Sequence, residues 1–181
     1  AYRRHKGLNQ IEQRSTMIVR TKRSNDDSII QAKLSKRLSQ YVRAFTCGAI
    51  IQEHYIDKNR TAISNTLFSL GYPGYDIVHL DMLKDADVIN LHWVNYYQSL
   101  ITLGKLFDLK KPVVWTLHDQ WAFTGGCHYS ADCGQYADVC ARCPQLSDDP
   151  FGLPSAVLKD KHDVFAREDI TIVTPSRWLA D

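Results

Sequence analysis

The chain alternates short apolar runs with segments whose apolar residues recur at helical spacing. Val88–Leu91 and Pro112–Leu117 are mostly apolar runs, as expected for strands buried on both faces of a parallel sheet. Between them, residues 98–109 place leucines and a phenylalanine on one helical face. A further helix, from residue 154 or 155 to about residue 167, precedes a last strand at Ile170–Val173. Because strand, helix and strand repeat twice, the pattern predicts an α/β fold, a Rossmann-like and mostly parallel sheet flanked by helices.

The N-terminal half has a less regular pattern. Ala1–Leu8 predicts a helix, and Gln13–Arg20 predicts a strand. After a polar loop, an apolar stripe at helical spacing predicts a helix that packs against the sheet; it consists of Ile30, Leu34, Leu38, Val42 and Phe45. Residues 71–74 indicate a turn, and residues 76–84 a short helix or a loop. Both chain ends fall inside predicted elements, so we expect a piece of a larger protein rather than a complete small domain.

Composition places the chain among ordinary soluble proteins. Its 181 residues suit one domain, with 44% hydrophobic and 23% charged residues. No apolar run approaches the roughly 18 residues that a membrane helix needs, and no secretory signal opens the chain. Residues 1–43 hold 11 of the 22 Lys and Arg residues and three acids, a net charge of about +8. This surface is either merely solvated or attracts an anionic partner such as a lipid surface, an acidic sugar or a phosphate. A nucleic-acid partner is not expected, because no binding motif accompanies the charge.

Polar residues follow two of the predicted strands. His92 comes directly after one strand, and His118-Asp119 after the next. Because ligands gather outside the carboxyl ends of parallel strands, both imidazoles are expected to face one crevice. Aromatic residues lie close by in sequence, and histidine can act there as an acid, a base or a hydrogen-bond donor. Gly125-Gly126 indicates either a close backbone approach to a phosphate or sugar, or a plain turn. The sequence has no nucleophile-elbow, Walker or H-E-x-x-H motif.

Four cysteines follow the histidine in the order C-x5-C-x6-C-x2-C, namely Cys127, Cys133, Cys140 and Cys143. Four thiols at such spacing predict a structural zinc site, with His128 as a substitute ligand. Reduced thiols or disulfides are the alternatives, and the absence of a secretory signal disfavours disulfides. A catalytic metal is not expected, because four cysteine ligands leave no open coordination position. The metal would hold the loop after His118 in shape.

Four segments together carry a family resemblance: DADVINLHWVN, KKPVVWTLHDQWAFTGGCHYSADC, CARCPQL and TPSRWLAD. They resemble the N-terminal half of GT-B glycosyltransferases of the group 1 type, most closely the bacterial subset of exopolysaccharide and colanic-acid-like synthesis. AYRRHKGLNQIEQRSTMIV resembles the first helix and second strand of that half. The resemblance implies two Rossmann-like domains flanking a cleft, with a nucleotide sugar bound mainly to the C-terminal domain and the acceptor to the N-terminal one. It also implies retention of anomeric configuration without a catalytic divalent metal.

The resemblance also implies roles for single residues. His118 matches a histidine that lies beside the transferred sugar and its leaving phosphate. Asp119 would orient that histidine or contact a hydroxyl group. The acceptor side would be lined by Trp93, Trp121, Gly125 and Gly126, and Arg177 would face phosphate or serve only as a surface cap. Asn90 departs from the pattern, because relatives often carry histidine at this position.

These expectations define one leading hypothesis. Residues 1–181 would form a single acceptor-side domain, truncated at both ends, of a cytoplasmic enzyme that contacts the inner face of the membrane. Its partners would be a nucleotide-sugar donor and a saccharide or lipid-linked acceptor. Because transfer needs both sides of the cleft, the fragment alone is expected to be inactive. The alternatives are a non-catalytic metal-knuckle module that binds an anionic partner through its basic N-terminal face, and a thiol-redox protein that uses Cys140 and Cys143.

Overall fold

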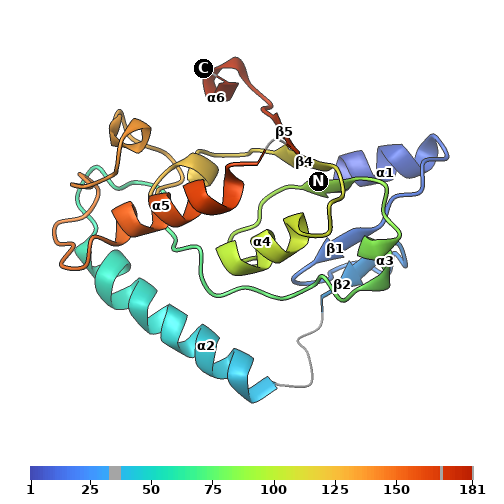
Figure 1. The fold of residues 1–181 in the computed structure, drawn as a ribbon, viewed down its shortest axis with the longest axis horizontal. Helices are drawn as coiled ribbons and strands as arrows, with labels where there is room; N and C mark the ends of the chain where they lie inside the picture. Colours follow the sequence, from blue (N-terminus) through green and yellow to red (C-terminus); the bar gives the residue numbers. More distant parts are fainter. Residues whose placement is uncertain (33–37, 168, 181) are drawn as a thin grey trace.

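A parallel sheet lies at the centre of the fold (Figure 1). The computed structural model describes residues 1–32, 38–167 and 169–180. Within these ranges the sheet has the strand order β3 (Ile89–Leu91), β4 (Val113–Thr116) and β5 (Ile170–Val173). All neighbours pair in parallel, and the last residue of β3 lies opposite the third residue of β4. The predicted α/β class with a parallel sheet is confirmed. Each strand lies within its predicted segment.

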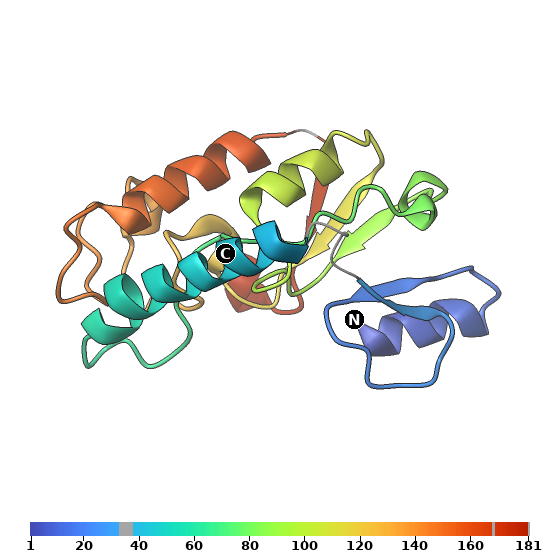
Figure 2. The ribbon, with the colours of Figure 1, turned by 90° about the horizontal axis from the view of Figure 1, so that it is seen from below.

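Two helices, α4 (Leu100–Phe107) and α5 (Leu153–Phe165), cover one face of this sheet (Figure 2). Helix α4 begins at a capping box, in which the Ser99 hydroxyl accepts the Thr102 N–H and the Thr102 hydroxyl accepts the Ser99 N–H. Its leucines are fully buried, as the helical spacing predicts. The end of α5 packs Phe165 edge-on against Trp115, with ring centroids 4.9 Å apart. The apolar stripes of both helices therefore build the core on this side of the sheet.

The N-terminal unit contains α1 (Tyr2–Gln10) and a second parallel pair, β1 (Met17–Val19) and β2 (Ile29–Gln31). Strand β2 corrects the sequence prediction, which assigned Ile30 to a helix. A short apolar run fits either element, and here the pairing with β1 decides for a strand. Buried His5 bonds the hydroxyl groups of Ser15 and Ser28 through its two ring nitrogens, each at 3.0 Å, and so ties α1 to the segments that precede β1 and β2.

Helix α2 (Leu38–Ile51) does not pack as predicted either. Val42 is exposed, and the helix instead lies along the 72–75 segment, where Phe45 contacts Tyr75 and Gly48 leaves room for Pro73. One face of the sheet is covered by α4 and α5, and the stripe of α2 does not share in this contact. Residues 33–37, including Leu34 of the predicted stripe, lie outside the described residues. Among the described helices, none has the length and apolar character needed to cross a membrane.

The long connection between β4 and α5 carries the cysteines. It contains 3-10 turns at Trp121–Phe123 and Gln135–Ala137, and isolated bridges join it to the 60–68 segment. A small second core of Ile56, Phe68, Cys127 and Leu146 lies beneath it. Turns at Gln52–Ile56 and Asp57–Asn59 extend α2, and the remaining helices are short, α3 (Asp81–Lys84) and α6 (Arg177–Ala180).

Candidate active site

His92 and His118 meet at the carboxyl edge of the sheet. His92 follows the end of β3, and His118 follows the end of β4, which is the neighbouring strand. Nδ1 of His92 lies 2.9 Å from Nε2 of His118, a hydrogen-bonding distance. The His118 ring is exposed, whereas the His92 ring is partly buried. Parallel pairing thus brings together two imidazoles that are 26 residues apart in the sequence.

Positive groups surround His92. The pKa of His92 is lowered from its usual value, first by burial and also by the positive charges of His118 and Arg4. Arg4 belongs to α1 and donates Nη1–H to the Thr116 hydroxyl at 3.4 Å, at the end of β4. His92 is therefore neutral at neutral pH, beside an exposed histidine and a guanidinium group. Such an edge favours an anionic or hydroxyl-rich ligand.

Asp119, the second predicted catalytic residue, points away from His118. Its side chain is buried, and Oδ2 lies 2.7 Å from Nδ1 of His128. Its other oxygen accepts the backbone N–H of Trp121 at 3.0 Å. The carboxylate therefore orients His128, and the partner of His118 is His92 instead.

The bonds continue from His128 into the interior. Nε2 of His128 lies 2.9 Å from the Ser69 hydroxyl, which also accepts Nδ2–H of Asn95 at 2.8 Å. Asp119, His128 and Ser69 are arranged in the order carboxylate, imidazole and hydroxyl, as in a hydrolase triad. However, Ser69 is 1% exposed, so no substrate can reach its hydroxyl. These hydrogen bonds form a buried polar network that joins Asp119 to Ser69 and Asn95, which are 50 and 24 residues away in the sequence. Because both His128 nitrogens are engaged in it, this histidine is not available as a metal ligand.

The two predicted substrate tryptophans have different positions. Trp93 is 51% exposed and stacks over His128, with ring centroids 5.3 Å apart. Trp121 is 2% exposed and donates Nε1–H to the Ser69 carbonyl at 2.9 Å. Trp93 is thus accessible beside His92, while Trp121 belongs to the core. Tyr129, one of the aromatic residues expected near the histidines, is exposed, and its hydroxyl donates to the His118 carbonyl at 3.5 Å.

The predicted glycines face protein rather than solvent. A Cβ at Gly125 would lie 2.6 Å from the Pro154 carbonyl oxygen, and one at Gly126 would lie 2.5 Å from the Phe68 ring. Gly126 also has a φ of +136°, which favours glycine. In this structure both residues allow the loop to pack closely, as in the plain-turn alternative. Arg177 is exposed at the start of α6.

A buried lysine on α5 was not anticipated from the sequence. Lys161 is 1% exposed, and its Nζ donates to the carbonyls of Trp121 and Thr124, the latter at 2.8 Å. The ammonium group also lies 3.7 Å from the centroid of the Trp121 ring. Burial lowers its pKa well below the usual value. The sequence indicates the burial of Lys161 only weakly, through its position on the inner face of a helix with polar neighbours.

The four clustered cysteines line one small cavity of about 20 Å³. All five cysteines of the chain are free, and Cys47 is exposed elsewhere, on α2. Burial raises the pKa of the Cys127 and Cys140 thiols, and raises that of Cys143 to about 11. Within the described residues, no group of three or more His, Cys, Asp or Glu side chains is already arranged to hold a metal ion.

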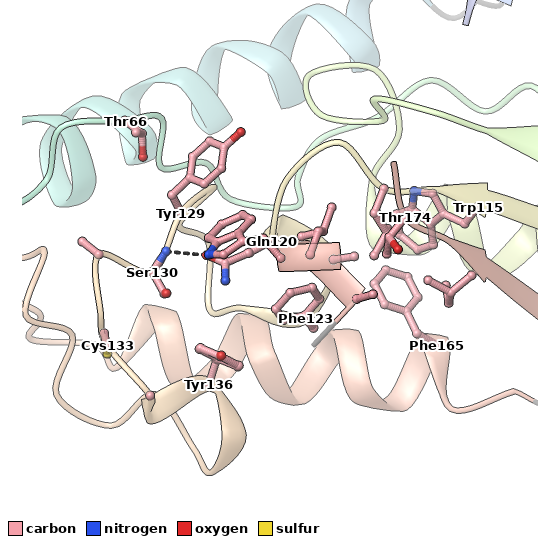
Figure 3. A pocket seen from close by; sticks show the side chains of 18 of the residues that line it. Thr66, Trp115, Gln120, Phe123, Tyr129, Ser130, Cys133, Tyr136, Phe165 and Thr174 are labelled. Carbon is pink, nitrogen blue, oxygen red and sulfur yellow. Dashed lines mark hydrogen bonds between the residues drawn. The ribbon is translucent and has the colours of Figure 1, made fainter. Parts of the chain in front are cut away.

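A second and much larger cavity also borders the cysteine loop (Figure 3). It measures about 1170 Å³ and is lined by aromatic, aliphatic and some polar side chains, which come mainly from β4, β5, the end of α5, α6 and the cysteine loop. Neither histidine of the pair lines it. Its link to the candidate site is Tyr129, which lies at the cavity and contacts His118. The volume thus adjoins the histidine pair without containing it.

Fold and site together define a class, a Rossmann-like α/β half-domain with an exposed histidine at the carboxyl edge of a parallel sheet. The sequence is similar to the Escherichia coli (strain K12) protein named "Putative colanic acid biosynthesis glycosyl transferase WcaC", with 29% identity over 104 residues. The match covers 52% of this chain and 25% of that protein. No protein-family model and no solved structure matches the chain.

Proposed function

We propose that the chain is the acceptor-side domain of a glycosyltransferase that moves a sugar from a nucleotide-sugar donor to a saccharide or lipid-linked saccharide acceptor. The process would be bacterial polysaccharide synthesis. One observation supports this most: an exposed histidine at the sheet edge in a chain that is similar to a colanic acid glycosyl transferase. In this proposal His118 lies beside the leaving phosphate or the transferred sugar. Exposed Trp93 offers an aromatic face to the acceptor.

The wider proposal follows the family resemblance. It comprises a GT-B arrangement with a separate donor-binding domain, transfer with retention of configuration, and a cytoplasmic reaction at the inner face of the membrane. The described arginines and lysines of residues 1–32 are mostly exposed and would attract anionic headgroups. Because donor and acceptor must be held together, residues 1–181 alone are proposed to be inactive.

Nucleotide release from sugar nucleotides tests the function in the protein that contains this chain. His118→Ala should lower turnover by about 10²- to 10³-fold, the usual effect of losing a positioned proton donor or charge-stabilising group. His162→Ala is the matched control, because this exposed histidine of α5 lies away from the sheet edge and should leave turnover unchanged. Unchanged circular dichroism shows that both variants fold. Full activity of His118→Ala would remove this histidine from the mechanism.

We further propose one structural zinc ion bound by Cys127, Cys133, Cys140 and Cys143. The support is the number and kind of donors around one cavity, because four thiolates are a usual structural zinc set. The thiols are not gathered around an ion position, so binding would draw them inward. The ion would brace the loop that follows the 118–128 segment.

Elemental analysis tests this site. The purified chain should contain about one zinc ion, as a single four-ligand site requires. Cys143→Ser should abolish the zinc content, whereas Cys47→Ser, on the exposed face of α2, should preserve it. Metal-free protein that folds and reacts fully with thiol reagents would contradict the proposal.

Neither alternative function gains support from the described residues. A thiol-redox role needs an exposed cysteine of low pKa, whereas burial raises the pKa of Cys140 and Cys143. Nothing in the comparisons favours a non-catalytic module that binds an anionic partner through its basic face.

A further inference from the structure

The hydrogen bond between the two histidines decides which nitrogen of His118 remains open to a ligand. Nε2 of His118 is engaged with Nδ1 of His92 at 2.9 Å. Among the residues that the structure describes, none provides a hydrogen-bond partner for Nδ1 of His118, and the ring is exposed. Nδ1 is therefore the nitrogen that remains for a ligand.

The charges around His92 determine its protonation state. Facing His92 are His118 from the end of β4 and the guanidinium group of Arg4 from α1. Together with burial they keep His92 neutral at neutral pH, so it has one nitrogen that donates and one that accepts. When Nδ1 of His92 accepts, it takes the Nε2–H of His118. An additional proton on His118 then appears as an outward Nδ1–H.

We propose that His92 is a positioning residue, which holds His118 through Nε2 so that Nδ1 remains open to solvent and contacts a phosphate or hydroxyl oxygen of the substrate. This inference rests on the proposed function for the identity of the substrate, but the geometry of the pair can be measured without it. Arg4 supports the phosphate alternative, because its guanidinium group lies at the same edge.

Nitrogen-15 spectra of the histidine rings test the geometry in the 181-residue chain. In wild type, His118 should carry its proton on Nε2, and added inorganic pyrophosphate should shift the resonance of Nδ1 more than that of Nε2. His92→Asn should preserve both results, because the Asn Oδ1 can replace Nδ1 as acceptor. His92→Leu removes the acceptor, so the preference for the Nε2 proton should fall and pyrophosphate should shift both nitrogens similarly. A His118 proton on Nδ1 in wild type, or spectra unaffected by His92→Leu, would overturn the inference.

Kinetics in the protein that contains this chain provide a second test. His92→Leu should lower kcat by about 10- to 100-fold, the effect expected when a reacting group is misplaced, with little change in KM. His92→Asn should keep activity within a few-fold of wild type. In a His118→Ala background, His92→Leu should have no further effect, because its role is exerted through His118. An equal loss in both backgrounds would refute a positioning role. Failure to detect any transfer would refute the proposed function and leave the spectra to decide on His92.

Discussion

The substitution Lys161→Met measures how much the buried lysine beneath the candidate site contributes to the free energy of unfolding. Methionine is similar in length to lysine, but it is apolar and cannot donate hydrogen bonds to the Trp121 and Thr124 carbonyls. A buried acceptor left without its donor costs about 1–3 kcal/mol. The Trp121 carbonyl keeps a second donor, the Thr124 N–H at 3.5 Å, so the Thr124 carbonyl should account for most of this cost.

The pH dependence gives the sign of the charge effect. In the folded chain, burial lowers the pKa of Lys161 well below the usual value of 10.5. At any pH between the folded-state pKa and 10.5, the unfolded chain therefore binds a proton that the folded chain does not. Unfolding free energy therefore rises with pH across this window, by up to about 1.4 kcal/mol per pH unit for one proton. The methionine variant lacks this slope. Relative to Lys161→Met, wild type should gain stability as the pH rises toward 10.5 and be more stable by about 1–3 kcal/mol once the lysine is neutral in both states.

Urea unfolding followed by tryptophan fluorescence measures this difference in stability. The measurements run from about pH 7 to pH 10, below the usual pKa of lysine, where the slope is expected. Lys159→Met is the matched control, because Lys159 lies on the exposed face of the same helix and pairs with Asp163 at 2.7 Å. Such an exposed and solvent-screened pair contributes little to stability. A wild-type advantage over Lys161→Met that does not change with pH would refute the reasoning.

Two further substitutions test the local packing. Gly126→Ala should lower the free energy of unfolding by about 1–3 kcal/mol in urea titrations, because Gly126 has a φ of +136° and a Cβ would meet Phe68. Gly134→Ala is the control and should be neutral, because open space surrounds Gly134. Ser99→Ala should cost about 1 kcal/mol by thermal unfolding, because it removes the cap of α4, and an unchanged midpoint would mean that the cap is dispensable.

Short-range patterns were sufficient to place the histidine pair. The apolar runs that end at His92 and His118 predicted two neighbouring strands, and parallel pairing then brings both rings to one edge. Strand β2 was missed because Ile29–Gln31, with only two apolar residues beside a helical stripe, has no periodicity of its own. Only its pairing with β1, a contact between separate segments, distinguishes the two possibilities.

The partners of the site residues could not be predicted for the same reason. Asp119 precedes His128 by nine residues, yet their bond depends on a loop that folds back over Ser69 and Asn95. Lys161 is 40 residues from Trp121, and a lysine on a helix is ordinarily exposed. Sequence spacing identifies polar residues at strand ends, but it carries no information on which of them become buried.

The burial of these partners also explains why His118 differs from its neighbours. The loop after it is fastened from three directions: by Lys161 of α5, by Ser69 through His128, and by Phe68 against Gly126. A buried polar network of this kind is stable only when every member is satisfied, so the loop has little freedom to change shape. His118 stands at its start with a single side-chain partner, His92, and an exposed ring. A ligand can therefore act on this ring and its one hydrogen bond without disturbing the core beneath it.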